Sequence, residues 1–187
     1  AAYFPPQPEP GTIPATITQV VHGGHVSATQ AARELIDGAA ERLDVMNPYF
    51  TDADMVRRIL AAADRGVAVS VVVSQKSNNA LASAALRHRY PDLFGAGVEI
   101  WEYPGAVVHA KLIIADDRVQ FGTLNLDAWS LYRAFEVAMV ADDPASANRF
   151  RERVFGPAIA RSGPAVAPST IGARIMGIAG SRIAYFL

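Results

Sequence analysis

The segment AVVHAKLIIADDRVQFGTLNLD, residues 106–127, combines an apolar, strand-forming pattern with polar residues at fixed intervals. Successive side chains of a β-strand point to opposite faces, so we expect His109 and Lys111 to share one face while Leu112 and Ile114 share the other. If the strand is central, burying an ammonium group is costly unless the group is paired. Lys111 is therefore expected either to extend from an edge strand into solvent or, as we favour, to face an anion beside His109.

More polar residues follow on the next strands. Gly122 opens a stretch in which Thr123 and Asn125 stand two apart, and the missing side chain lets backbone or ligand come close. Glu136 is isolated in the apolar run AFEVAMV, residues 134–140. This set suits phosphoryl transfer, which needs a nucleophile of near-neutral pKa and donors for the nonbridging oxygens. Because no second histidine lies nearby in sequence, we expect no metal site and no cofactor.

The rest of the chain predicts an α/β domain. Strands are expected at 15–21, 44–50, 67–73 and 97–103, alternating with helices at 27–43, 51–66 and 80–90. Three strands with short connections follow at 106–116, 118–125 and 134–142, before a helix at 144–160. We expect a mixed, largely parallel sheet flanked by helices on both faces.

The composition limits the classes of function. With 51% hydrophobic and 19% charged residues among 187, the chain is expected to be globular, and it has no apolar run long enough for a membrane span. It has no cysteine, which excludes disulfides and thiolate metal sites. A net charge of −1 gives no general attraction to a polyanion, so nucleic acid is the less favoured partner.

Two motifs resemble the phospholipase D superfamily. HAKLIIAD matches its H-x-K-x4-D signature, and GTLN matches the G-[ST]-x-N that follows it. GTLNLDAWSLYRAFEVAMV, NPYF, RGVAVSVVV and GVEIWEYPG resemble the cardiolipin synthase and lipid-acting branch, so the similarity covers residues 16–160. The interval from Asp116 to Gly122 is one residue shorter than usual, and Ala134 stands where that branch often has Asn.

The resemblance implies roles for the site residues. His109 would be catalytic, through a phosphohistidine or as acid and base. Lys111 and Asn125 would hold phosphate oxygens, Thr123 would support them, and Glu136 would orient an imidazole. The substrate would be a phospholipid, undergoing phosphatidyl transfer or phosphodiester hydrolysis.

Other positions are assigned smaller roles. Asp116 is counted in the catalytic motif, but we expect it to fix the turn after its strand, and Asp127 to act as a local cap or ion partner. Tyr49, Lys76 and Asn78 follow the carboxyl ends of parallel strands and are candidates for substrate binding at the rim.

The family needs two such motifs in one active site, and this chain has one. Either two copies pair as a homodimer, or a longer protein supplies the second motif from its other half. The Pro-rich residues 1–15 resemble the connector between such halves, so we favour the second arrangement. The alternatives are a homodimeric phosphodiesterase or nuclease of the same superfamily, and a half-domain that is inactive alone.

The tail, residues 161–187, could form an amphipathic helix. Ile171, Ile175, Ile178 and Phe186 would lie near one side, with Arg174 and Arg182 placed to meet anionic headgroups. Docking on the domain, or on a missing half, is the favoured alternative to a membrane surface. The resemblance favours membrane association, with a secreted or periplasmic location left open.

Overall fold

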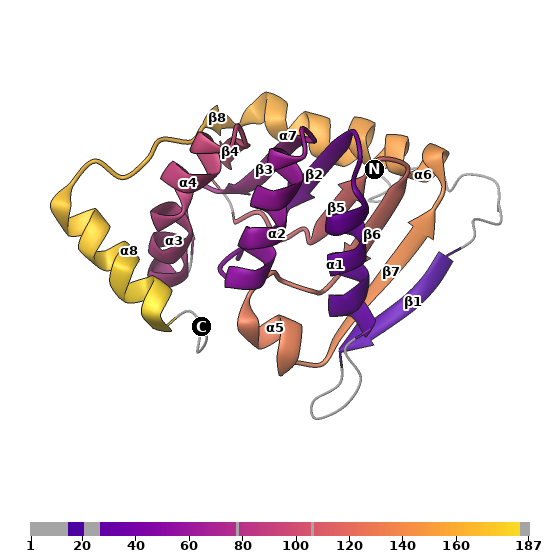
Figure 1. The fold of residues 1–187 in the computed structure, drawn as a ribbon, viewed down its shortest axis with the longest axis horizontal. Helices are drawn as coiled ribbons and strands as arrows, with labels where there is room; N and C mark the ends of the chain where they lie inside the picture. The colour runs from indigo at the N-terminus through magenta and orange to yellow at the C-terminus, as the bar shows by residue number, and fades with distance from the viewer. Residues whose placement is uncertain (1–14, 21–26, 78, 106, 184–187) are drawn as a thin grey trace, which may run out of the picture.

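The computed structural model describes residues 15–20, 27–77, 79–105 and 107–183 (Figure 1). The strands are β1 (Ala15–Val20), β2 (Arg42–Met46), β3 (Ala68–Ser74), β4 (Glu99–Tyr103), β5 (Leu112–Ala115), β6 (Arg118–Gly122), β7 (Glu136–Asp142) and β8 (Gly163–Pro164). The helices are α1 (Ser27–Gly38), α2 (Ala53–Asp64), α3 (Ala80–His88), α4 (Tyr90–Gly95), α5 (Ala128–Tyr132), α6 (Pro144–Phe150), the π-helical turn η1 (Arg151–Phe155), α7 (Gly156–Arg161) and α8 (Ile171–Ile183). His22, His25, Asn78 and Phe186 lie outside the described residues, as does most of the expected Pro-rich arm.

All eight described strands form one sheet, in the order β1-β7-β6-β5-β2-β3-β4-β8. The α/β class and the mixed sheet are confirmed. Only β2–β3 and β3–β4 are parallel, however, and the other five described pairings are antiparallel, so the expectation of a largely parallel sheet is wrong. Short loops join the strands of the second half, and a parallel pair would need a crossover of a dozen or more residues.

Helices cover both faces of the sheet, as expected. The larger core packs α1 and α2 against inward residues of β2 and β3, such as Val45 and Val71. The smaller core lies on the opposite face, where Phe155 of η1 packs with Met46, Val72 and Leu112. Alternate residues of β3 thus enter different cores, which explains its continuous run of branched apolar residues.

Several expected boundaries differ from the structure. The helix expected at 27–43 ends at Gly38, and β2 starts at Arg42. The strand expected at 106–116 begins only at Leu112, because β2 ends opposite Leu112, at Met46, and β6 ends at Gly122. Residues before Lys111 therefore have no partner in the ladder. The helix expected at 144–160 is three consecutive pieces, α6, η1 and α7.

The tail forms α8, which packs on α3 at the far side of the molecule from β1 (Figure 1). A Cβ added to Gly177 would lie 2.8 Å from His88 Cβ, and one added to Gly180 would lie 2.8 Å from Leu81 O. The two glycines therefore allow close helix packing, and docking on the domain is the outcome for the described part of the tail. Within the described residues, no helix has the length and apolar character needed to cross a membrane.

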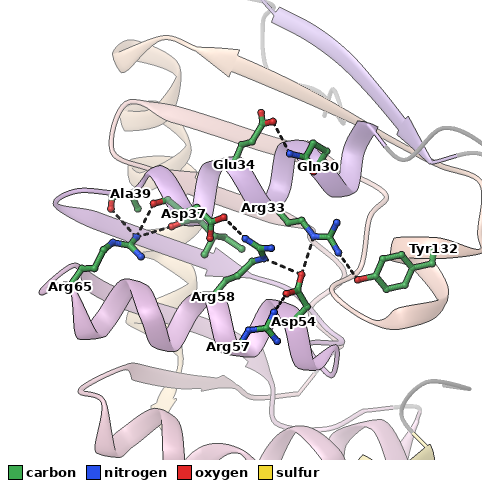
Figure 2. Close-up of polar contacts among 11 residues, drawn as sticks. Gln30, Arg33, Glu34, Asp37, Ala39, Asp54, Arg57, Arg58, Arg65 and Tyr132 are labelled. Atoms are coloured by element: carbon green, nitrogen blue, oxygen red, sulfur yellow. Dashed lines mark hydrogen bonds and ion pairs between the residues drawn. The ribbon is translucent and has the colours of Figure 1, made fainter.

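An ion-pair network joins α1, α2 and α5 (Figure 2). Asp54, in the first turn of α2, accepts hydrogen bonds from Arg33 at 2.9 Å and Arg58 at 3.0 Å, and it also pairs with Arg57. Although burial opposes the shift, the guanidinium groups of Arg58 and Arg33 lower the pKa of Asp54. Arg33 also donates to Tyr132 Oη at the end of α5, at 2.9 Å. The network therefore fixes α5, the short helix after the polar segment 122–127, against the helical layer.

Candidate active site

The segments that carry Lys111, Thr123 and Glu136 converge at one end of the sheet. Gly122 N donates to Lys111 O at 3.2 Å, so the end of β6 lies beside the start of β5. Thr123 N donates to Val137 O at 2.9 Å, which brings the next residue of that segment to the start of β7. The parallel strands β2 and β3 end at this same edge, because Met46 pairs with both Val72 and Leu112.

Gly122 is needed for close approach of two backbones. A Cβ at this position would lie 2.2 Å from Val137 O and 2.7 Å from Ala138 Cα. Any other residue would push β7 away from β6 at the level of the site. The missing side chain thus makes room for the backbone of β7.

Thr123 and Glu136 form one hydrogen-bonded unit. Thr123 Oγ1 donates to Glu136 Oε2 and accepts from Val137 N at 3.0 Å. The hydroxyl therefore holds the carboxylate at the mouth of the site. Among the described hydrogen bonds, Glu136 accepts from Thr123, and none runs from the ring of His109 to Glu136.

Lys111 is buried, with 8% of its surface exposed, whereas His109 is exposed. Lys111 Nζ donates to His109 O at 2.8 Å. Burial lowers the pKa of Lys111, and the negative charges of Glu136 and Asp127 oppose that shift. The ammonium is thus hydrogen-bonded to the backbone of His109 and feels the negative charges of Glu136 and Asp127.

The segment before His109 is irregular but anchored. Val108 N donates to Ser74 Oγ at 2.8 Å, which ties this segment to the carboxyl end of β3. The expectation that His109 and Lys111 lie on one face of a regular strand is wrong in that β5 begins only at Leu112, after both residues. They are brought together by the local backbone and the Lys111–His109 hydrogen bond.

Asn47 holds the loop that carries Asn125, and it was not among the expected site residues. Its Nδ2 donates to Leu124 O at 3.2 Å, while its Oδ1 accepts from Leu126 N at 3.3 Å. It also accepts from Tyr49 N at 3.1 Å. Asn47 follows β2 and precedes Pro48, a pattern that predicts a turn but does not identify its distant partner.

Asp127 is buried and caps α5, as expected for a local cap. Its Oδ1 accepts from Ser130 N at 2.8 Å. Burial raises the pKa of this carboxyl, the Ser130 N–H opposes the shift, and the negative charge of Glu136 adds to it.

A cavity of about 610 Å³ adjoins this loop. Asn125, Asp127 and Tyr49 line it, together with residues from the start of α3 and from α5. Lys76 is exposed in the loop after β3 and is not among the lining residues. Of the rim candidates, the structure therefore brings Tyr49 to the cavity that contains the Asn125 side chain.

Asp116 lies at the other end of β5, five residues or roughly 16 Å from Lys111. Its carboxylate accepts hydrogen bonds from the backbone N–H groups of Ala40, Glu41 and Arg42 at 2.8–3.0 Å. Although burial opposes the shift, these three donors lower the pKa of Asp116. Asp116 has a φ of 48° and anchors the tight turn to the start of β2, where we expected it to fix the turn after its strand.

Among the described residues, no group of three or more His, Cys, Asp or Glu side chains is arranged to hold a metal ion. The chemistry that these side chains themselves can provide is that of an exposed imidazole, a buried ammonium, an amide and a hydroxyl-bound carboxylate.

Comparison with known proteins agrees with this geometry. The family described as "Cardiolipin synthase, PLD-like domain" matches residues 32–155. Cardiolipin synthase A of Salmonella arizonae is 36% identical over 126 residues, which are 66% of this chain and 24% of that protein. The match thus spans about a quarter of the length of these curated relatives.

Two solved structures share the fold. A phospholipase D family member, Nuc from Salmonella typhimurium, superposes with a TM-score of 0.71 at 23% identity, covering 82% of this chain and 99% of that chain. Phosphatidylserine synthase from Haemophilus influenzae superposes with a TM-score of 0.70 at 13% identity, covering 95% of this chain and 46% of that chain. The same fold therefore occurs as a nearly whole chain and as about half of one.

Proposed function

The chain belongs to the phospholipase D superfamily, in its cardiolipin synthase-like family, and on that premise we propose that it cleaves or transfers phosphodiesters of phospholipids. The observation that carries this proposal is the buried ammonium of Lys111, which donates a hydrogen bond to the backbone of the exposed His109. An ammonium has three donors, and the described contacts use one of them on His109 O. A phosphate oxygen is the ligand that fits the remaining donors.

The proposed reaction has two steps. A ring nitrogen of His109 attacks phosphorus, the bond from phosphorus to the leaving alcohol breaks, and a second histidine protonates that alcohol. Water or an acceptor alcohol then gives its proton to the second histidine and attacks the phosphohistidine, which releases His109. Lys111 and Asn125 stabilise charge on the nonbridging oxygens, while Glu136, held by Thr123, orients an imidazole.

The second histidine comes from outside this motif. The other half of a longer protein is the favoured source, because the match covers 24% of cardiolipin synthase A and the fold covers 46% of the phosphatidylserine synthase chain. Exposed apolar side chains of β1 and β7, Ile17, Val137 and Met139, border the start of β7. They offer a surface that a second domain would cover.

The test replaces the exposed imidazole. In the active assembly we expect His109→Ala to lower phosphatidyl transfer and hydrolysis by several orders of magnitude, because the nucleophile is lost. The melting temperature should stay near that of the parent, because His109 is exposed. His88→Ala, on α3, is the matched control and should keep full activity. Equal loss of thermal stability and activity in His109→Ala would instead indicate a structural histidine.

A homodimeric phosphodiesterase or nuclease is the second candidate, because the fold covers nearly all of the Nuc chain. Parallel assays on phosphatidylglycerol vesicles and single-stranded DNA separate the two. Cleavage of DNA alone would reverse the order of the candidates. Sedimentation velocity tests the third alternative by measuring the oligomeric state. A monomer that turns over neither substrate would be the half-domain that is inactive alone.

A further inference from the structure

The tail helix α8 turns a glycine face inward and an apolar face outward. Gly177 and Gly180 lie against α3. Ile171, Ile175 and Ile178 lie on the opposite side, because residues three and four apart share one face of a helix. Their exposed fractions are 78%, 60% and 48%. Within the described part of the chain, this apolar face therefore remains largely open to solvent, at the side of the molecule far from β1 (Figure 1).

The segment that contains this helix is basic. Residues 153–187 contain four arginines and no aspartate or glutamate, although the whole chain carries a net charge of −1. Arg182 is exposed and follows Ile178 at the next helical interval. α3, on which α8 packs, also lacks acidic residues, and one carboxylate, that of Asp92, borders the cavity beside Ile178. The outer face of α8 thus consists of four exposed residues, Ile171, Ile175, Ile178 and Arg182.

This combination favours a lipid surface over a protein partner. The three isoleucines expose on the order of a few hundred Å², whereas each partner in a stable protein interface buries roughly 800 Å². A bilayer needs no complementary shape, and binding to it follows the buried apolar area plus the attraction of basic groups to anionic lipids. The aliphatic stem of Arg182 can lie along the apolar face while its guanidinium reaches a lipid phosphate.

The outer face of α8 is also separate from the surface that a second domain would cover. That surface lies on β1 and β7, at the other side of the molecule (Figure 1). A second domain on β1 and β7 would therefore leave α8 free to meet a bilayer.

We propose that the outer face of α8 binds the surface of a bilayer that contains anionic phospholipid. With 13 residues, α8 lies along the interface, because crossing a bilayer takes about 20 residues. Its end near Gly180 adjoins Leu81 at the start of α3, which helps to line the cavity beside Asn125. Binding therefore holds that edge of the domain near lipid. This inference goes beyond the proposed function and does not depend on the reaction.

Vesicle binding by the full chain tests the proposal without turnover. Cosedimentation compares vesicles of phosphatidylcholine alone with vesicles that also contain about 30% phosphatidylglycerol. We expect binding to the anionic vesicles, and weaker binding as the salt concentration rises. Ile171→Ser combined with Ile175→Ser should lower this binding about tenfold or more, because apolar area is lost. Arg182→Gln should lower it about fivefold, and on anionic vesicles only.

The matched control is Ile17→Ser, at an apolar residue of β1 that is 70% exposed. It should bind vesicles as the parent does. The replaced side chains are all exposed, so the melting temperatures should stay near that of the parent. Absence of binding to anionic vesicles, or an equal loss of binding in Ile17→Ser, would overturn the proposal.

A fluorescent label identifies which face enters the bilayer. The chain has no cysteine, so Ile175→Cys and Ile17→Cys each provide a single attachment point. The emission of a polarity-sensitive dye at position 175 should shift to the blue when anionic vesicles are added, whereas that of a dye at position 17 should not. A blue shift at position 175 that grows with protein concentration, without vesicles, would show that a second copy covers the face and would overturn the proposal. Vesicle binding by α8 in a protein that cleaves no phosphodiester would support this surface and count against the proposed function.

Discussion

Asp116 shows how one residue of the H-x-K-x4-D sequence motif serves the fold. Its carboxylate accepts three backbone hydrogen bonds at the start of β2, at the opposite end of β5 from Lys111. The pKa of Asp116 is lowered in the folded protein, so this carboxylate stabilises the fold above the unfolded pKa, near 4. That contribution is lost as the pH falls through the lowered folded pKa.

We therefore expect Asp116→Asn to reduce the free energy of unfolding by about 1–3 kcal/mol at pH 7. Activity well below the melting temperature should remain close to that of the parent. Urea unfolding at pH 7 and near pH 3 checks this, because the difference between variant and parent should shrink in acid. Asp117→Asn, at the exposed neighbour in the same turn, is the control. Loss of turnover without loss of stability in Asp116→Asn would indicate a direct catalytic role.

The spacing of individual residues pointed to part of the candidate site and missed Asn47. His109 and Lys111 were found because their spacing in H-x-K is specific, and Asp127 because caps follow from local sequence. Asn47 was missed, since its partners Leu124 and Leu126 are more than 75 residues away. Residues so far apart in sequence come together through the topology of the sheet, which local sequence patterns do not reveal.

The contact between α3 and α8 depends on two glycines. Sequence alone treats Gly177 and Gly180 as weakening the helix, because glycine costs about 1 kcal/mol relative to alanine. The structure shows their use, since each lies against α3 where a Cβ would collide. Propensity could not predict this, because the compensating contact belongs to another helix.

We expect Gly180→Ala to weaken the docking of α8 by about 1–3 kcal/mol, because the added methyl group meets the backbone oxygen of Leu81. Hydrogen exchange along α8 should speed up, while the sheet keeps its protection. Gly172→Ala is the control in the same helix, since a Cβ there meets nothing within 4 Å. Faster exchange in both variants would show that glycine packing does not hold the helix.

The sheet joins two differently built halves along one pair of strands. β2, β3 and β4 are parallel, whereas β5, β6, β7 and β1 form an antiparallel series, and β2–β5 is the seam between them. The alternation of helices and strands predicted the first half well. The second half was expected as strands but not placed, because sequence gives no direct information on which distant strand pairs with β5.

We expect amide exchange to be slowest in β2 and β5, because they occupy the middle of the sheet and are covered by both cores. The edge strands β1 and β8 should exchange several orders of magnitude faster. Mass spectrometry of peptides from each strand measures this order. Early exchange in β5 would show that the two halves of the sheet open independently.

The β2–β5 pair forms late during protein synthesis. When β2, β3 and β4 have left the ribosome, the edge of β2 that β5 will cover still lacks its neighbour, because β5 follows β2 by about 70 residues. A nascent chain at that stage presents an open row of backbone groups to other unfinished chains. The speed of elongation through residues 104–122 then sets how long this uncovered side of β2 can pair with the wrong molecule.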